Sequence, residues 1–477
     1  MSHLLTDDVV AFINKYLSDT ATLTSLNEDV LLKIGEYLSN RNKLSLSATN
    51  QYMCNMKCKF VYYDTVNILR VQHLLPHYRF KNVQCDLDST EIPEHVTHVY
   101  FRKNFNGCVD GMVPDTVRSI VFGTNYNTKL SGTYPKSLTN IKFGSGFQQD
   151  LCGCTMSSLT HLELGAKFNG KINADSFPSL LSLEFGHNFN KDIANMIPKT
   201  VKYLRFGHKF DQPITNYLPP SLEHLIFGDD FDQDIANSIP SSLVSIQFGY
   251  NFNQQIKDCI TNSITHLTFG CTFNQPINNA LPSSLTHLVF GDKFDQSIKD
   301  ALPSSLVSIQ FGYNFNQQIK DCIPDSVTHL TFGSMFDQTI NNALPSSLTH
   351  LVFGHNFDYP IIKNIPSNIK NLTFGYFFNK SIADAIPDGV THLTFGHTFN
   401  QKIDGHIPAS VTHLMFGDHF NQKMSIFPPS IVCVRFGHNF TKPLPKHVPD
   451  TLKKIYLPNA YKVPYLKFRS PTIVVGI

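Results

Sequence analysis

The sequence contains no tryptophan, few charged residues and no long apolar run. Only 16% of its 477 residues are charged, against roughly 25% in a typical globular protein. The net charge of +2 gives no electrostatic reason to predict nucleic acid or an anionic membrane as a partner. Because 42% of the residues are apolar, the low charge indicates a large buried core and excludes a disordered chain.

No apolar stretch approaches the ~20 residues that a membrane-spanning helix needs. The first ten residues, MSHLLTDDVV, carry acids where a secretory signal carries bases. We therefore expect an intracellular protein, cytoplasmic or nuclear, whose ten cysteines stay reduced. Cys54 with Cys58, and Cys152 with Cys154, have the spacing of zinc half-sites, but neither pair has a second ligand pair at usable spacing. Free thiols are the favoured interpretation, and no metal site or cofactor is predicted.

What the sequence has in excess is phenylalanine, 39 residues in all, and most of it belongs to a repeat. A Phe-Gly pair recurs every 21 residues, with Leu164-Gly165 filling one gap and a final step of 20 residues to Gly437. The other glycines of this series are Gly123, Gly144, Gly186, Gly207, Gly228, Gly249, Gly270, Gly291, Gly312, Gly333, Gly354, Gly375, Gly396 and Gly417. A degenerate unit at Arg102 precedes them.

Taking this glycine as position 0, a typical unit is LTHLVFGDKFDQSIKDALPSS, which begins at Leu285. Phe occupies position −1 in 16 of 17 units and position +3 in 16 of 17 units. The segment before the glycine alternates apolar and polar residues, which predicts a short strand with one buried face that the glycine ends. Ile at +7 supplies a further inward side chain. Pro at +12 ends the backbone hydrogen bonding before the next strand because it has no N–H to donate.

One such unit cannot bury its apolar side chains alone, but stacked units can. The repeat therefore predicts a solenoid: a parallel β-sheet with one short strand per turn, short irregular return segments and continuous columns of Phe and Leu. With ~4.8 Å between strands, the stack offers a long surface and no single deep pocket.

Position +4 is Asn or Asp in 15 of the 17 units. The side-chain oxygen that these residues share can accept from backbone N–H groups in a tight loop, so we predict that the column holds the turn. A ladder of calcium ions is the alternative, and the predominance of neutral Asn argues against it.

The whole pattern, F-G-x-x-F-N-Q-x-I followed by x-x-x-[IL]-P, resembles the FNIP repeat family, relatives of the leucine-rich repeats found in protists and their large DNA viruses. The resemblance covers residues 93–449 and implies a curved scaffold that binds proteins. It brings no catalytic residue, and the sequence has no nucleophile elbow or phosphate-binding glycine loop, so we do not expect an enzyme.

In such a solenoid, positions −4, −2 and +1 are expected to face the concave side. Histidine fills many of them, which admits a metal-binding or pH-sensing face, but we favour imidazoles that stack or hydrogen-bond along the sheet. Position −2 varies more, and we predict that its central members bind the target protein. These residues are Ile226, Thr268, Val289, Thr331, Val352, Thr394 and Met415.

The residues before the repeat have helical periodicity. Asp29, Val30, Leu31, Ile34 and Leu38 predict a first helix, and two more are expected before residue 65. Segment 26–65 resembles an F-box, with Asn27 where that family has proline. The resemblance implies that the segment binds the adaptor of a cullin-RING ligase, and that Leu26, Val30, Leu31, Ile34 and Leu38 are its adaptor-facing or F-box core residues. The alternative is a helical cap over the first strand.

These assignments divide the chain into a helical extension (1–25), the F-box-like segment (26–65), a degenerate first repeat (66–92), the solenoid (93–449) and a C-terminal cap (450–477). They predict a non-enzymatic substrate-recognition subunit of an SCF-type ubiquitin ligase, with the adaptor and an unknown target as partners. The protein would act in the host cell if viral, and be a monomer outside the ligase. A stand-alone binding scaffold is the alternative.

Overall fold

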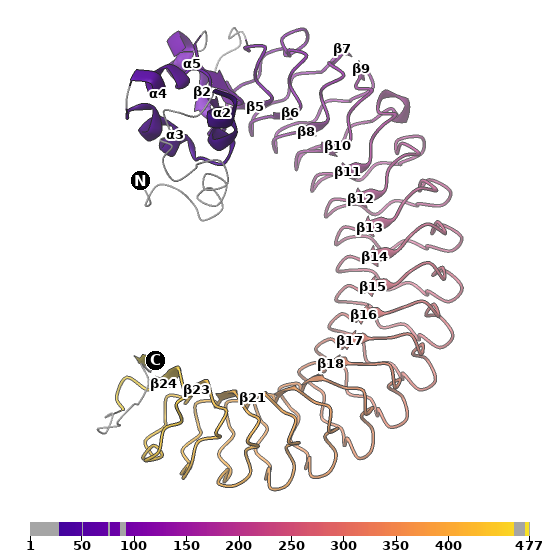
Figure 1. Ribbon diagram of the computed structural model, residues 1–477. Helices are drawn as coiled ribbons and strands as arrows, with labels where there is room; N and C mark the ends of the chain where they lie inside the picture. The colour runs from indigo at the N-terminus through magenta and orange to yellow at the C-terminus, as the bar shows by residue number, and fades with distance from the viewer. Residues whose placement is uncertain (1–27, 50, 75–76, 86–91, 462–472, 477) are drawn as a thin grey trace. The chain divides into compact units, whose positions relative to one another are not determined.

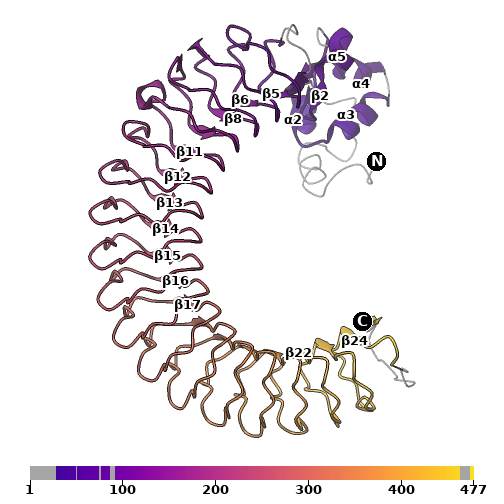
Figure 2. The same cartoon turned by 180° about the vertical axis from the view of Figure 1, so that it is seen from behind.

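The computed structural model describes residues 28–49, 51–74, 77–85, 92–461 and 473–476. The chain forms two compact units, residues 1–209 and 210–477. The repeated turn that the sequence predicts is present in each unit, with one short strand per turn followed by an irregular return segment (Figure 1; seen from behind in Figure 2). The predicted extension 1–25 lies outside the described residues.

The described part of the first unit begins, at residue 28, with three helices, as the periodicity before the repeat predicts. Acidic Glu28 and Asp29 lie in the first turn of the first of these helices, where their negative charges interact favourably with the helix dipole. Ser39 caps the second helix by accepting from the backbone N–H of Asn42 at 3.2 Å. The helices of this unit are α2 (Glu28–Glu36), α3 (Asn40–Ser47), α4 (Gln51–Met56) and α5 (Ile68–Val71), with 3-10 turns η2 (Gln72–Leu74) and η3 (Ala174–Ser176).

The main sheet of the first unit is parallel and runs in the order β2-β4-β5-β6-β8-β10-β11-β12. Two further parallel pairs, β1 with β3 and β7 with β9, lie outside it. The strands are β1 (Val61–Tyr62), β2 (Val66–Asn67), β3 (Arg79–Phe80), β4 (Asn82–Cys85), β5 (His98–Phe101), β6 (Ser119–Val121), β7 (Gly132–Thr133), β8 (Asn140–Lys142), β9 (Cys154–Thr155), β10 (His161–Glu163), β11 (Ser182–Glu184) and β12 (Tyr203–Arg205).

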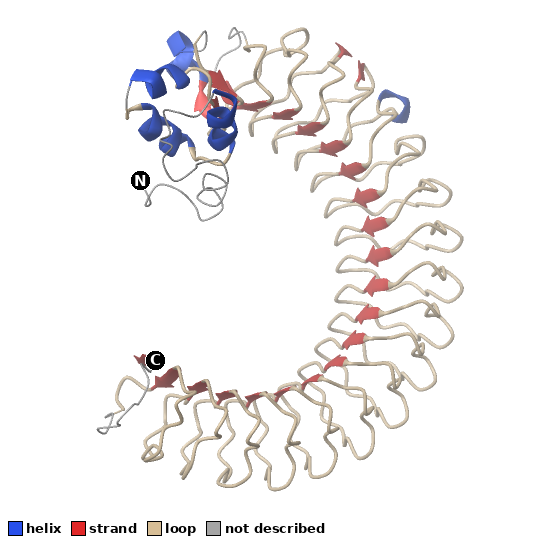
Figure 3. Ribbon diagram, in the orientation of Figure 1, coloured by secondary structure: helices blue, strands red, loops and turns tan. Residues whose placement is uncertain are grey.

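In the second unit every strand from β13 to β25 pairs in parallel with the next, and strands and return segments lie on different sides of the stack (Figure 3). The strands are β13 (His224–Ile226), β14 (Ser245–Gln247), β15 (His266–Thr268), β16 (His287–Val289), β17 (Ser308–Gln310), β18 (His329–Thr331), β19 (His350–Val352), β20 (Asn371–Thr373), β21 (His392–Thr394), β22 (His413–Met415), β23 (Cys433–Arg435), β24 (Lys454–Leu457) and β25 (Ile473–Gly476).

The predicted Phe and Leu columns form a continuous core within each unit. In one turn the rings of Phe290 and Phe294 stack with centroids 3.8 Å apart. Phe294 stacks in turn on Phe315 of the next turn at 6.1 Å. Leu285 and Leu288 are almost fully buried beside them. Offset ring stacking adds to the gain from burying this apolar surface, so the repeat stabilises itself at every step.

The glycine at position 0 has a role beyond ending the strand. A Cβ atom added to Gly291 would lie 1.7 Å from the carbonyl oxygen of Gly270 in the preceding turn, and one added to Gly165 would lie 1.8 Å from that of Gly144. No side chain fits at such distances. The column is glycine because the backbones of successive turns approach one another here.

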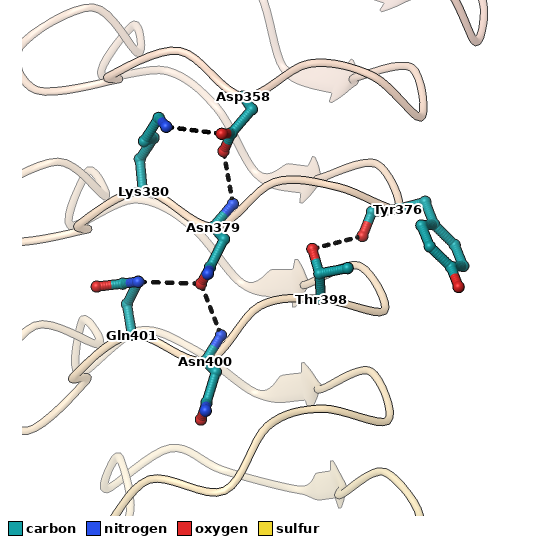
Figure 4. A network of polar contacts seen from close by, with 7 residues as sticks. All are labelled: Asp358, Tyr376, Asn379, Lys380, Thr398, Asn400 and Gln401. Carbon is teal, nitrogen blue, oxygen red and sulfur yellow. Dashed lines mark hydrogen bonds and ion pairs between the residues drawn. The ribbon is translucent and has the colours of Figure 1, made fainter.

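The Asn and Asp column also works differently from the prediction, which placed its hydrogen bonds within the loop. Asn379 Oδ1 accepts at 2.9 Å from the backbone N–H of Asn400, the same position in the next turn (Figure 4). Gln401, one residue further, donates to the same oxygen at 3.0 Å. The column therefore ties each turn to the next rather than closing its own loop. The column satisfies backbone donors that would otherwise be unpaired in the stack.

A third column, at position +9, was not anticipated from the sequence. Its backbone is left-handed, with φ of 58° at Asn195 and 55° at Asp300. In the 13 units where the backbone is left-handed, the residue is Asn, Asp or Gly, which tolerate this conformation best, with the single exception of Lys363. The full set is Gly111, Gly132, Asn195, Asn216, Asn237, Asp258, Asn279, Asp300, Asp321, Asn342, Lys363, Asp384 and Gly405. This bend turns the chain back toward the next strand.

Candidate partner-binding surface

The strand side of the second unit presents the side chains that the alternation predicts to face outward. In β16, His287 is exposed, Leu288 is buried and Val289 is half-buried. The same pattern recurs along the sheet, so positions −4 and −2 form one solvent-facing surface. We call these two columns the strand face.

The seven residues predicted to bind the target all lie on the strand face of the second unit. Six are half-buried, and Met415 is 37% exposed. Parallel pairing places Thr268 beside Val289, Thr331 beside Val352 and Thr394 beside Met415, whereas Ile226 lies beside Gln247. The surface is thus a strip of small and β-branched side chains; that it binds a target remains a prediction.

The histidines at position −4 stack in pairs, which agrees with the favoured interpretation of this column. Ring centroids are 4.4 Å apart for His266 and His287, and 4.1 Å apart for His329 and His350. His392 and His413 stack in the same way at 4.4 Å.

The residue before each of these histidines fixes the imidazole tautomer. Thr349 Oγ1 lies 2.9 Å from His350 Nδ1 and donates to the carbonyl oxygen of Thr328 at 3.1 Å. A hydroxyl has one proton, so both contacts are hydrogen bonds only if Nδ1 carries a proton and donates to the threonine. Nε2 is then the acceptor.

Burial lowers the pKa of several strand-face histidines. For His350 the loss of solvent is the larger cause, and the neighbouring His329 and His392 lower the pKa further. His266 and His413 shift in the same direction for the same reasons. For His266, His350 and His413, burial therefore favours the neutral imidazole.

A second exposed column, which we call the rim, follows the strands at position +1. Tyr250 is 53% exposed, Tyr313 is 48% exposed, and the ring of Tyr376 points away from the ribbon in Figure 4. His397 stacks on Tyr376 with centroids 4.5 Å apart. Our sequence reasoning considered only the histidines of this column; the recurrence of Tyr at 63-residue spacing was the signal it missed.

The structure separates buried from half-buried residues in the set that the F-box resemblance gives as adaptor-facing or core. Leu31, Ile34 and Leu38 are buried in the core of the helices, so they cannot contact a partner directly. Val30 is half-buried, and Leu26 lies outside the described residues. The large apolar side chains that do reach the surface of these helices are Tyr37, Leu44 and Tyr52.

Among the described residues, no group of three or more His, Cys, Asp or Glu side chains is placed to hold a metal ion. Cys54, Cys58 and Cys152 are exposed free thiols, and Cys154 is a buried one. Within the same described ranges, no helix has the length and apolar character needed to cross a membrane.

Comparison with known families identifies the family of the chain. The model of the FNIP Repeat family matches more than half of the sequence. The chain belongs to the FNIP repeat family. The matched residues are 108–146, 156–187, 179–209, 210–251, 252–293, 273–314, 294–335, 315–356, 336–377, 357–398 and 399–439.

This FNIP repeat protein is also similar to solved structures. CroV588, described as a novel circular leucine-rich-repeat protein, is 34% identical with a TM-score of 0.64, over 83% of this chain and 73% of that one. TLR13, from a TLR13–ssRNA13 complex, is 11% identical with a TM-score of 0.41, over 83% and 79%. A search of the curated proteins returned no match. The FNIP chain is a repeat solenoid of the leucine-rich-repeat type, a kind of scaffold that generally binds other proteins.

Proposed function

We propose that this FNIP repeat protein is a substrate-recognition subunit of an SCF-type cullin-RING ubiquitin ligase. The helices α2 to α4 dock onto the adaptor, and the strand face of the second unit binds the target. Ubiquitin transfer is then performed by the partners, and the chain itself supplies no catalytic group. The resemblance of segment 26–65 to an F-box supports the adaptor role.

The observation that carries the proposal is that the N-terminal helices differ in what they contact. The short helix α5 packs against β2 and β4, at the start of the sheet, which is what a cap must do. The helices α2 to α4 are held to each other and to the segment after them: Phe60 packs against Gly35, and buried Lys43 donates to the carbonyl oxygen of Val61 at 2.6 Å. Since α5 meets the sheet, α2 to α4 are available for a partner.

Exposed apolar side chains on those helices support the same conclusion. Leu44 of α3 is 45% exposed and Tyr37, directly after α2, is 50% exposed. These side chains are the apolar groups through which the helices would contact the adaptor.

Affinity purification of the full chain tests the adaptor role. We expect the cullin adaptor to co-purify with the wild type and to be lost with Leu44→Glu. Leu181→Glu, at an exposed leucine of the solenoid, is the matched control and should retain the adaptor. Ile34→Glu is unsuitable because Ile34 is buried and the helices would unfold.

If no adaptor co-purifies, or if Leu44→Glu leaves its recovery unchanged, the ligase role is wrong and the stand-alone scaffold is the better description. The target role is tested separately: replacing Val289, Val352 and Met415 together with Lys should abolish recovery of the partners that bind outside the helical segment. Unchanged recovery of every partner would exclude the strand face as the target-binding surface.

A further inference from the structure

The strand face and rim of the second unit carry only acidic formal charges over ten consecutive turns. From the turn of Gly228 to the turn of Gly417, the charged residues at positions −4, −2 and +1 are Asp229, Asp292 and Asp418. All three stand on the rim. The basic side chain nearest to Asp292 in sequence is Lys293, one residue further along the loop.

Two of the rim carboxylates are each followed by a tyrosine in the next turn. Asp229 is followed in the next turn by Tyr250, and the pair recurs as Asp292 and Tyr313, 63 residues or three turns later. A third tyrosine, Tyr376, follows at the same interval. With ~4.8 Å between adjacent strands, the recurring pairs are about 14 Å apart.

The contacts of two of these carboxylates are known, and Asp292 keeps capacity for further hydrogen bonds. Asp292 Oδ1 accepts a hydrogen bond from the backbone N–H of Tyr313 at 3.4 Å, and its Oδ2 accepts one from the thiol of Cys271 at 3.7 Å. Asp418 Oδ2 lies 3.2 Å from His397 Nδ1. A carboxylate offers about four lone-pair sites, so Asp292 can accept again from solvent or from a ligand.

The neighbouring strand face adds uncharged acceptors. The histidines whose Nδ1 atoms face a threonine present Nε2 lone pairs, as argued for His350. For His266 and His350, burial lowers the pKa and so favours this neutral form. Carboxylates, imidazole lone pairs and exposed aromatic faces are all groups that attract cationic donors, and they are gathered here on one side of the turns.

We propose that the rim binds an extended segment of a partner protein that carries Lys or Arg about every four residues. This proposal rests on the proposed target-binding function and names the class of target. At Tyr250 and at Tyr313 the cation lies over the ring and pairs with the carboxylate of the preceding turn, Asp229 or Asp292, whereas at Tyr376 it meets the ring without a carboxylate in an adjacent turn. The spacing follows because an extended chain advances ~3.3 Å per residue, so about four residues span three turns.

Fluorescence anisotropy at pH 7.5 with the full chain tests the proposal. The probe is a labelled 13-residue peptide with Arg at its residues 1, 5, 9 and 13, separated by Gly, Ser and Thr. Two control peptides carry Glu at the same places, or the four Arg side by side. We expect the spaced Arg peptide to bind at least about tenfold more tightly than either control, because only it matches both the charge and the period.

The double variant Asp292→Asn, Tyr313→Ser should weaken binding of the spaced peptide at least about fivefold. The matched control is Asp325→Asn, Tyr217→Ser, at exposed residues of the return segments, and it should bind as the wild type does. Thermal melts of both variants confirm that the fold is intact, since all four residues are on the surface.

Equal binding of the Glu peptide or of the clustered Arg peptide would overturn the proposal, as would wild-type affinity in the rim variant. These outcomes are distinct from failure of the proposed function. If the Lys variants of the strand face lose their partners while the rim variant keeps them, the target-binding surface stands and its preference for a basic segment is wrong.

Discussion

The early turns of the first unit and the turns of the second unit follow the same 21-residue plan, yet the early turns depart from it at several columns. Tyr126 and Leu164 replace Phe, and Gln148 replaces Asn. The 3-10 turn η3 stands where later turns have a left-handed residue, and β7 and β9 form an extra pair. In the second unit the columns are far more uniform.

The stack survives these departures because different columns hold it in different ways. Position 0 remains glycine in the turns from Gly123 onward in both regions, and the strands keep their register of 21 residues. The comparison teaches that the close approach of the backbones and the strand pairing are essential to the stack. Individual side-chain contacts of the Phe and Asn columns can be replaced by others. Five predictions test this ranking.

The largest effect is expected from adding a methyl group to the glycine column. Gly291→Ala and Gly165→Ala should each lower the free energy of unfolding by about 4 kcal/mol or more, because the Cβ would overlap a backbone carbonyl that cannot move without parting the turns. Chemical denaturation of the full chain measures this. Gly405→Ala, which has open space but a positive φ, should cost only about 1–2 kcal/mol. Tolerance of Gly165→Ala alone would mean that the early turns are not stacked in the same way.

The next effect concerns the Asn and Asp column at position +4. Asn316→Ala removes the acceptor for the backbone N–H of Asp337 at 2.9 Å and for Gln338 Nε2 at 3.0 Å, and should cost about 1–3 kcal/mol. Gln148→Ala, at the same column of an early turn but exposed, should stay within about 0.5 kcal/mol. Asn316→Asp keeps the accepting oxygen and should lower the free energy of unfolding less than Asn316→Ala does. Equal costs for Asn316→Ala and Gln148→Ala would remove the distinction between the two regions.

The third prediction exchanges the aromatic rings of the two regions. Tyr126 is fully buried, and its hydroxyl has no hydrogen-bond partner in the described part of the chain, so Tyr126→Phe should stabilise the protein by about 1 kcal/mol. The reverse change in the second unit, Phe231→Tyr, should destabilise it by a similar or larger amount. Urea denaturation of both variants checks the pair; a destabilised Tyr126→Phe would contradict the reasoning.

A smaller effect is expected at the left-handed column. Lys363 has φ of 58°, a conformation that Asn adopts more readily, so Lys363→Asn should raise the free energy of unfolding by about 0.5–1 kcal/mol. Lys299→Asn, one residue before the left-handed Asp300, is the control and should change it by less than about 0.5 kcal/mol. A rise in both variants would point to charge rather than backbone conformation.

The smallest effect per residue is the pH dependence from the strand-face histidines. His266, His350 and His413 have a lower pKa in the folded state than the usual ~6.5, so the unfolded chain binds more protons below that pH. Their contribution is fully present above about pH 6.5 and is lost as the pH falls. Thermal melts at pH 7.5 and 5.5 should show a lower Tm in acid. His350→Asn with His413→Asn should reduce that difference, and an unchanged difference would exclude these histidines as its source.

The sequence predicted the strand and the buried side chains of each unit, and missed features that depend on backbone conformation or on which turn is the neighbour. The Phe columns, the buried middle residue of each strand and the outward positions followed from a pattern seen many times. The partner of Asn379 did not, because its hydrogen bond reaches Asn400 in the adjacent turn. In the helical segment, helices could be predicted, but the pattern alone could not tell adaptor-facing from core residues, and the structure buries Leu31, Ile34 and Leu38.

The sequence by itself determined that this protein is a solenoid, since a 21-residue period with one alternating segment has a buried face that only stacking can satisfy. Tertiary structure alone decided how close the turns come, which is why the glycine column admits no Cβ. It also decided which tautomer the stacked histidines hold, because that depends on a threonine hydroxyl bound to the turn before. Local patterns fix what each residue prefers; only the packing of one turn on the next fixes which atoms meet.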